Sequence, residues 1–140
     1  MLQSNGKDKI EYVALYCRAE NTDPFSDEAV KMQEDALLHW IKASEINANV
    51  VRIFTGKGDP AQDALAEMMQ EMKQYGGKTL AATVSADRFS RNLWKLRCLM
   101  QIADAQNTTL YALRENTALN DETQMQMALC TALLKGGKAR

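Results

Sequence analysis

Short apolar runs alternate along this chain with longer segments in which apolar residues recur every three or four positions. Runs of the first kind are typical of buried strands, and the recurring pattern is typical of amphipathic helices. Strands are predicted at residues 12–16, 50–54, 79–84 and 109–113. Helices are predicted at about residues 26–47, 64–72, 90–107 and from residue 120 onward. Strands that alternate with helices predict an α/β fold with three layers, in which a mainly parallel sheet is flanked by helices.

Individual residues in the sequence predict where these helices and strands begin and end. Ser26 is predicted to cap the first helix, because two carboxylate residues follow it in the first turn. Residues 56–60 predict a flexible loop, and the glycine pairs at 76–77 and 136–137 predict helix ends. The apolar face predicted for the first helix comprises Ala29, Met32, Ala36, Leu37, Trp40 and Ile41.

Three polar segments are predicted to meet at one edge of the sheet. In parallel sheets, ligands bind at the carboxyl ends of the strands. Residues 16–20, 55–59 and 87–91 each end or follow a predicted strand. We therefore expect these segments to form the functional site.

Composition limits the class of protein. With 140 residues, 46% of them hydrophobic and 25% charged, the chain has the composition of one globular domain, which we predict to span residues 1–140. No apolar run approaches the ~18 residues that a transmembrane helix needs, and the first nine residues are polar, so a cytoplasmic location is expected. Cys17, Cys98 and Cys130 are odd in number and each lies in an apolar segment. They predict buried thiols rather than a disulfide framework or a zinc site.

Basic residues are concentrated after the third predicted strand. The net charge of −1 gives no overall attraction to DNA, so any nucleic-acid contact has to be local. Arg88, Arg91 and Lys95 are spaced so that a helix would carry all three on one side. Guanidinium groups one helical turn apart can bind a phosphate. The sequence therefore predicts a local DNA-backbone contact through these residues.

Two motifs frame the predicted site. Tyr16-Cys17-Arg18 ends the first strand, and Asp87-Arg88-Phe89-Ser90-Arg91 follows the third. Together they resemble the catalytic domain of serine recombinases, the resolvase and invertase family. Further matches, in the family's order, are Gln33 with Ala36-Leu37, Arg52-Ile53-Phe54-Thr55 with Lys57, and Gln126-Met127. The resemblance covers nearly the whole chain.

The resemblance implies a resolvase-like fold and DNA recombination without a metal or another cofactor. In that family a serine hydroxyl attacks a DNA phosphodiester and leaves a 5′-phosphoserine, while arginines stabilise the developing charge. By this resemblance, Arg18, Arg88 and Arg91 would bind the phosphate oxygens. Asp87 would orient them or hold a proton-transfer partner. The supporting residues would be Tyr16, Gln33 and Lys57. Dimerisation through the last helix and an origin in a mobile element are also implied.

The chain departs from the family at the nucleophile. The family's serine lies two residues after the arginine of the first motif, where this chain has Glu20. Gln62 or Leu65, depending on the register, stands where the family has an active-site arginine. We therefore predict a pseudoenzyme in which the Glu20 carboxylate pairs with the arginines. Two alternatives stay open: an active recombinase domain whose nucleophile is Ser26 or Thr22, and a protein-interaction module that does not bind DNA.

Partners follow from the same resemblance. In the family the last helix leads to a separate DNA-binding module, and none is expected within residues 1–140. We expect weak DNA binding without sequence preference. We also expect a homodimer, or association with an active recombinase.

Overall fold

Five strands form one sheet in the computed structural model, which describes residues 10–19, 24–57, 60–75 and 78–138. The strands are β1 (Ile10–Ala19), β2 (Ala48–Lys57), β3 (Thr79–Thr83), β4 (Thr108–Ala112) and β5 (Thr117–Ala118). The helices are α1 (Ser26–Ala43), α2 (Pro60–Lys73), α3 (Ala86–Phe89), α4 (Leu93–Ala105) and α5 (Glu122–Lys138). The strand order is β2-β1-β3-β4-β5, with β5 antiparallel to β4 and the other pairs parallel. The predicted α/β fold with a mainly parallel sheet is confirmed.

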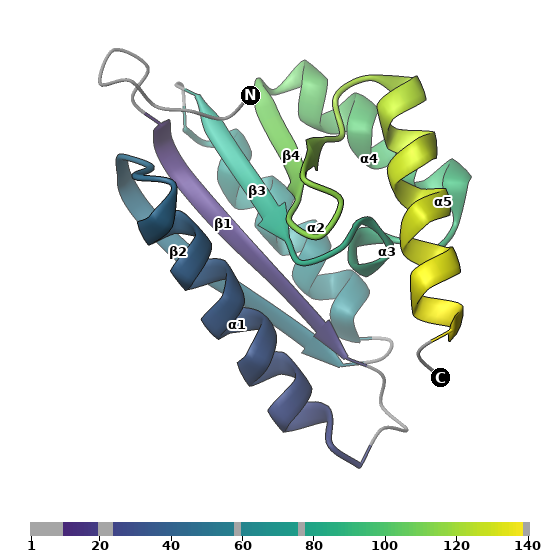
Figure 1. Ribbon diagram of the computed structural model, residues 1–140. Coiled ribbons are helices and arrows are strands. Elements are labelled where there is room, and N and C mark those ends of the chain that lie inside the picture. The colour runs from purple at the N-terminus through teal and green to yellow at the C-terminus, as the bar shows by residue number, and fades with distance from the viewer. Residues whose placement is uncertain (1–9, 20–23, 58–59, 76–77, 139–140) are drawn as a thin grey trace.

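The inner strand β1, paired with β2 and β3, separates two apolar layers, because successive side chains of a strand point to opposite faces. Leu15 and Cys17 pack on one face with Leu37 of α1. Ala14 and Tyr16 pack on the other face, in a cluster to which α2, α3, α4 and α5 contribute. Figure 1 shows α1 in front of the sheet and α2 and α4 behind it. Burial on both faces explains why β1 reads as an unbroken apolar run.

The helix predicted over residues 90–107 is wrong at its start. The chain forms the single turn α3, leaves the helical conformation at Ser90 (φ −169°, ψ 143°) and begins α4 at Leu93. Asn92 caps α4, since its side-chain oxygen accepts the backbone N–H of Lys95 at 3.1 Å. Arg88 and Lys95 therefore belong to different helices, and the prediction that one helix face carries Arg88, Arg91 and Lys95 is also wrong.

Helix α1 differs from its prediction in its cap, in its end and in its buried face. It begins at Ser26 with Phe25 in the N-cap position, so Ser26 is not the cap, and it ends at Ala43. Met32, predicted to be buried, is 71% exposed, whereas Gln33 is 7% exposed. The buried stripe runs through Val30, Gln33 and Leu37 because Gln33 turns inward to the end of β1.

Smaller predictions also fail. The loop predicted over residues 56–60 is wrong at three positions, because Gly56 and Lys57 continue β2 and Pro60 begins α2; residues 58–59 lie outside the described residues. The glycine pair at 136–137 lies inside α5. Strand β5 was not predicted. Of the three thiols predicted to be buried, Cys17 is buried, and Cys98 and Cys130 are exposed. Among the described helices, none is long and apolar enough to cross a membrane.

Candidate functional site

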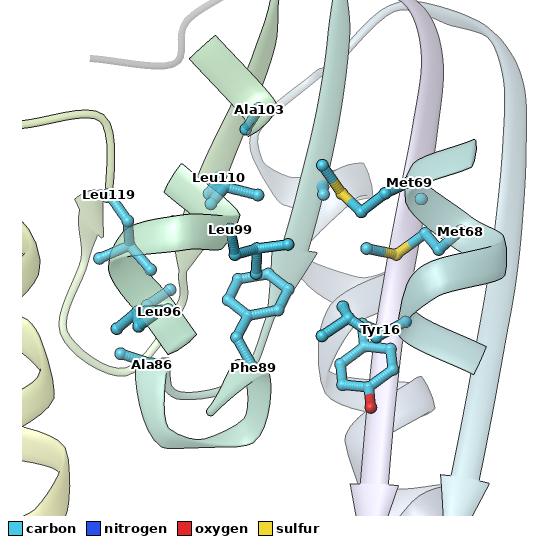
Figure 2. Close-up of a cluster of buried hydrophobic side chains, with 14 of the residues drawn as sticks. Tyr16, Met68, Met69, Ala86, Phe89, Leu96, Leu99, Ala103, Leu110 and Leu119 are labelled. Atoms are coloured by element: carbon cyan, nitrogen blue, oxygen red, sulfur yellow. The ribbon is translucent and has the colours of Figure 1, made fainter. Parts of the chain in front are cut away.

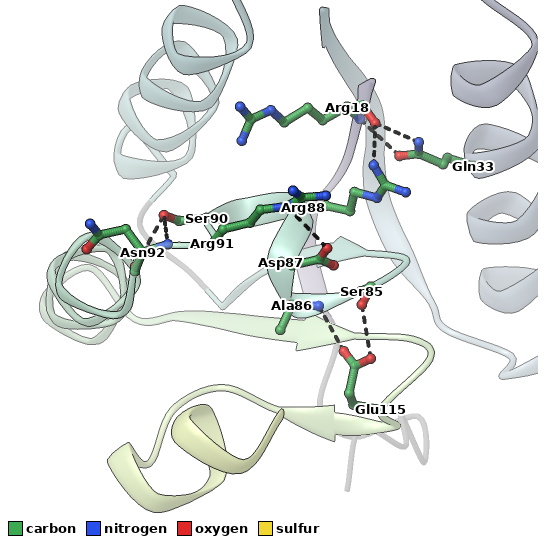
Figure 3. A network of polar contacts seen from close by, with 10 residues as sticks. All are labelled: Arg18, Gln33, Ser85, Ala86, Asp87, Arg88, Ser90, Arg91, Asn92 and Glu115. Atoms are coloured by element: carbon green, nitrogen blue, oxygen red, sulfur yellow. Dashed lines mark hydrogen bonds and ion pairs between the residues drawn. The ribbon is translucent and has the colours of Figure 1, made fainter. Parts of the chain in front are cut away.

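Arg18 lies where β1 extends beyond its neighbour β3. The last pair between the two strands is Tyr16 with Thr83, so the end of β1 has no neighbouring strand on that side. The side chain of Gln33 takes its place: the Arg18 N–H donates to Gln33 Oε1 at 2.9 Å, and Gln33 Nε2 donates to the Arg18 carbonyl at 2.7 Å. A side-chain amide thus replaces a peptide unit of the missing strand and fixes the Arg18 backbone (Figure 3).

Arg88, which lies in α3, also contacts the backbone of Arg18. Its Nη1 donates to the Arg18 carbonyl at 3.4 Å, and its own N–H donates to the Ser85 carbonyl at 2.9 Å. The Nε atoms of Arg18 and Arg88 are buried and have no hydrogen-bond partner among the described residues. A buried donor left without an acceptor costs about 1–3 kcal/mol. Each of these guanidinium groups therefore favours an anion that supplies oxygen acceptors.

Asp87 and Arg91 form a pair beside these guanidinium groups. Arg91 Nε lies 3.8 Å from Asp87 Oδ2, with side-chain exposures of 41% and 9%. Because a mostly buried carboxylate on a four-residue helix faces this arginine, Asp87 limits where Arg91 can point. The role of Asp87 in orienting the arginines stays a prediction.

Glu115 was missed by the sequence analysis. It lies in the turn between β4 and β5, and its carboxylate accepts the Ser85 hydroxyl at 3.0 Å and the Ala86 N–H at 2.8 Å. These two residues begin α3. A glutamate in a short turn carries no sequence signal for such a contact, because Ser85 and Glu115 are 30 positions apart.

Tyr16 and Ser90 support the site from inside the protein. The Tyr16 ring stacks on Phe89 of α3, with ring centroids 5.9 Å apart, and both lie in the apolar core (Figure 2). Burial raises the pKa of Tyr16 to about 12, so the phenol stays protonated at neutral pH. The Ser90 hydroxyl accepts the Asn92 N–H at 3.0 Å and donates to the Asn92 carbonyl at 3.2 Å. Ser90 thus holds the break between α3 and α4.

The remaining predicted residues are less closely tied to this cluster. Lys95 is exposed in the first turn of α4, and Lys57 ends β2. Ser26 begins α1. Glu20 and Thr22 lie outside the described residues. The structure brings together Arg18, Gln33, Asp87, Arg88 and Arg91.

A separate groove of about 650 Å³ lies between α2 and α4. Its lining is largely apolar and includes Leu65, Met69 and the exposed Trp94. The charged residues that line it are Lys73 and Lys95. Its apolar lining distinguishes it from the polar cluster around Arg18 and Arg88. Within the described part of the chain, no group of three or more His, Cys, Asp or Glu side chains is placed to hold a metal ion.

The solved structures that are similar to this chain in fold include three recombinase-related proteins. A resolvase family site-specific recombinase from Streptococcus pneumoniae has a TM-score of 0.69 at 15% identity, covering 93% of this chain and 91% of that one. The N-terminal catalytic domain of TP901-1 integrase has a TM-score of 0.65 at 13% identity, covering 92% and 97%. The C-terminal catalytic domain of ISC1926 TnpA, an IS607-like serine recombinase, has a TM-score of 0.60 at 11% identity, covering 73% and 70%.

Sequence comparisons give the family directly. A search of curated proteins gave no match. The family described as "Resolvase, N terminal domain" matches residues 13–135, which include most of β1, all of the helices α1 to α4, and Arg18, Gln33, Asp87, Arg88 and Arg91. The chain therefore belongs to the resolvase N-terminal domain family.

Proposed function

We propose that this protein acts in site-specific DNA recombination by binding DNA phosphates and associating with recombinase subunits, without cutting DNA itself. The observation that carries the proposal is that Arg88 contacts the Arg18 carbonyl, while the buried Nε atoms of both arginines have no hydrogen-bond partner among the described residues. A phosphodiester offers two unesterified oxygens, which match the planar donors of guanidinium groups. The domain-level resemblance to recombinases supports DNA as the source of that phosphate.

The proposed lack of cleavage rests on the position two residues after Arg18, where this chain has Glu20. A carboxylate at about 4 Å from a phosphodiester would repel it by roughly 1–4 kcal/mol, depending on the effective dielectric constant. An acyl phosphate formed by a carboxylate is also prone to hydrolysis, whereas strand exchange requires a DNA end that is held and resealed.

Nearby serines are already engaged. The Ser90 hydroxyl is hydrogen-bonded to the Asn92 backbone on both its donor and acceptor sides. The Ser85 hydroxyl donates to Glu115, and Ser85 is fully buried. Neither serine presents a free hydroxyl to a phosphodiester. Ser26 and Thr22 remain as the nucleophiles of the alternative hypothesis, an active domain.

We also propose that Glu20 neutralises the arginine cluster in the absence of DNA. Arg18 and Arg88 place positive charge on partly buried side chains, and Glu20 is the acidic residue nearest to Arg18 in the sequence. Such a pair would occupy the place of the phosphate. DNA binding would then require the carboxylate to withdraw, so weak affinity is expected.

Association with a second subunit is proposed to use α5. Its apolar side chains Met127, Leu133 and Leu134 are 67%, 38% and 69% exposed. A helix with several exposed apolar residues loses unfavourable contact with water when it is covered. The partner would be a second copy or an active recombinase.

Two assays on matched variants test the proposal. The first incubates wild type, Glu20→Ser and Glu20→Ala with suicide-substrate DNA and looks for covalent adducts on denaturing gels. We expect no adduct with wild type or Glu20→Ala, beside an active recombinase that gives one. An adduct with Glu20→Ser would show that the arginines still support the chemistry, and an adduct with wild type would refute the proposed lack of cleavage. The modified peptide would then distinguish Ser26 from Thr22.

The second assay measures DNA binding by fluorescence anisotropy as a function of salt. We expect Arg88→Ala to bind about 10- to 100-fold more weakly and to lower the salt dependence, because a charge-assisted hydrogen bond contributes about 1.5–3 kcal/mol. Lys42→Ala removes one positive charge at the opposite edge of the sheet, in the last turn of α1. Equal affinities for these two variants would contradict phosphate binding by Arg88 and would favour a protein-interaction module.

A further inference from the structure

Glu115 connects the turn between β4 and β5 with the start of α3. Its Oε2 accepts the Ser85 hydroxyl at 3.0 Å, and its Oε1 accepts the Ala86 N–H at 2.8 Å (Figure 3). Ser85 and Ala86 are fully buried. The carboxylate is therefore the partner of two groups that cannot turn to water instead.

Helix α3 needs such a support. It consists of the four residues Ala86–Phe89, which is too short for a helix to be stable by itself. Ser85 occupies its N-cap position but makes no capping hydrogen bond with its own side chain. Glu115 satisfies the first N–H of the helix in its place. The next two residues, Asp87 and Arg88, carry the polar groups of the site.

The turn that carries Glu115 is itself fixed to the core. The N–H groups of Leu113 and Arg114 donate to the carbonyls of Thr83 and Val84 at 2.9 and 2.8 Å. The Tyr111 hydroxyl donates to the side chain of Asn116, whose backbone is in the left-handed region with a φ of 52°. Glu115 therefore projects from a turn with little freedom to move, and α3 is held against a fixed point.

We propose that Glu115 is a positioning residue that holds the α3 turn so that Arg88 meets a DNA phosphate. The inference rests on the phosphate-binding function proposed above. Glu115 acts through its contacts with Ser85 and Ala86, and it makes no contact with the phosphate. The turn between β4 and β5, which none of the site motifs includes, thereby becomes part of the binding machinery.

Loss of the Glu115 carboxylate has opposite expected effects on DNA affinity, depending on whether its charge or its support of α3 decides. Removal of an acidic group from the neighbourhood of a phosphate-binding arginine strengthens DNA binding if charge alone decides. If position decides, loss of the support for α3 weakens DNA binding. Asp35→Ala provides the charge-matched control, because it removes one carboxylate from an exposed pair with Lys31 on α1, on the other face of the sheet.

The test compares wild type, Glu115→Ala, Glu115→Gln and Asp35→Ala for binding to a short fluorescein-labelled DNA duplex. We expect Glu115→Ala to bind about tenfold or more weakly, and Asp35→Ala to bind as well as wild type or slightly better. Glu115→Gln is expected to restore binding, because its amide oxygen can accept the Ala86 N–H and its amide nitrogen can donate to the Ser85 hydroxyl. Affinity of Glu115→Ala equal to or above that of wild type overturns the proposal.

Hydrogen exchange gives a readout that does not depend on DNA. The Arg88 and Ser90 N–H groups donate to the carbonyls of Ser85 and Ala86, so they report whether the α3 turn is closed. We expect faster exchange in residues 85–91 of Glu115→Ala and unchanged exchange in β1 and α1. Failure of wild type to bind DNA refutes the proposed function, and hydrogen exchange then decides by itself whether Glu115 holds the α3 turn. Unchanged hydrogen exchange of residues 85–91 in Glu115→Ala overturns the positioning role.

Discussion

Replacement of Gln33 by methionine would remove two hydrogen bonds while keeping nearly the same volume in the core. Gln33 is 7% exposed and pairs with both backbone groups of Arg18, at 2.9 and 2.7 Å. Methionine fills the same space but can neither accept the Arg18 N–H nor donate to its carbonyl. The substitution therefore isolates the polar contribution from the packing contribution.

The expected magnitude follows from what each backbone group of Arg18 loses. The N–H is left without a partner, which costs about 1–3 kcal/mol, and the lower half of that range applies because the end of β1 is only partly buried. The carbonyl keeps its contact with Arg88 and loses one hydrogen bond, worth about 0.5–1.5 kcal/mol. Gln33→Met is therefore expected to lose about 1.5–3.5 kcal/mol of the free energy of unfolding. For a chain of this length, 1 kcal/mol corresponds to about 3–4 °C, so the melting temperature is expected to fall by about 5–14 °C.

Chemical denaturation followed by circular dichroism measures this loss, and fluorescence anisotropy measures DNA affinity on the same samples. We expect DNA binding to weaken as well, because the carbonyl of Arg18 also accepts a hydrogen bond from Arg88. Gln101→Met on α4 is the matched control: Gln101 is exposed, and exposed substitutions usually change stability by less than about 0.5 kcal/mol. A loss of less than about 0.5 kcal/mol for Gln33→Met would refute the view that the amide replaces a missing strand.

Two further predictions concern buried titratable groups. Burial raises the pKa of the Cys17 thiol to about 12. A thiol reagent at pH 8 is therefore expected to label the exposed Cys98 and Cys130 and to reach Cys17 only in denaturant. Mass spectrometry counts the labels, and three labels on the native protein would contradict the buried position of Cys17. Burial likewise raises the pKa of Tyr16 to about 12, above its ordinary value near 10, so its protonated form stabilises the fold below about pH 10. This contribution, about 2–3 kcal/mol, is lost as the pH rises from 10 to 12. Denaturation curves at pH 8 and 11 should show a smaller loss for Tyr16→Phe than for wild type, and an equal loss would contradict the assignment to Tyr16.

The failed predictions share a physical cause. Met32 and Gln33 are neighbours on α1, and hydrophobic spacing favours Met32 as the buried one. Gln33 is buried instead because the end of β1 offers it two backbone groups, which are not visible in the sequence around either residue. Similarly, Ser90 and Asn92 interrupt a segment with helical periodicity, because their side chains satisfy backbone groups that a continuous helix would have paired internally.

The sequence by itself determined the alternation of strands and helices, the parallel sheet and the edge where Arg18, Asp87, Arg88 and Arg91 meet. These features depend on local periodicity and on the rule that parallel strands carry their ligand-binding groups at the carboxyl ends. The tertiary structure alone decided that Gln33 completes the end of β1 and that Glu115 supports α3. Both contacts join residues distant in the sequence through a few directional hydrogen bonds, and such bonds leave no periodic pattern in the chain.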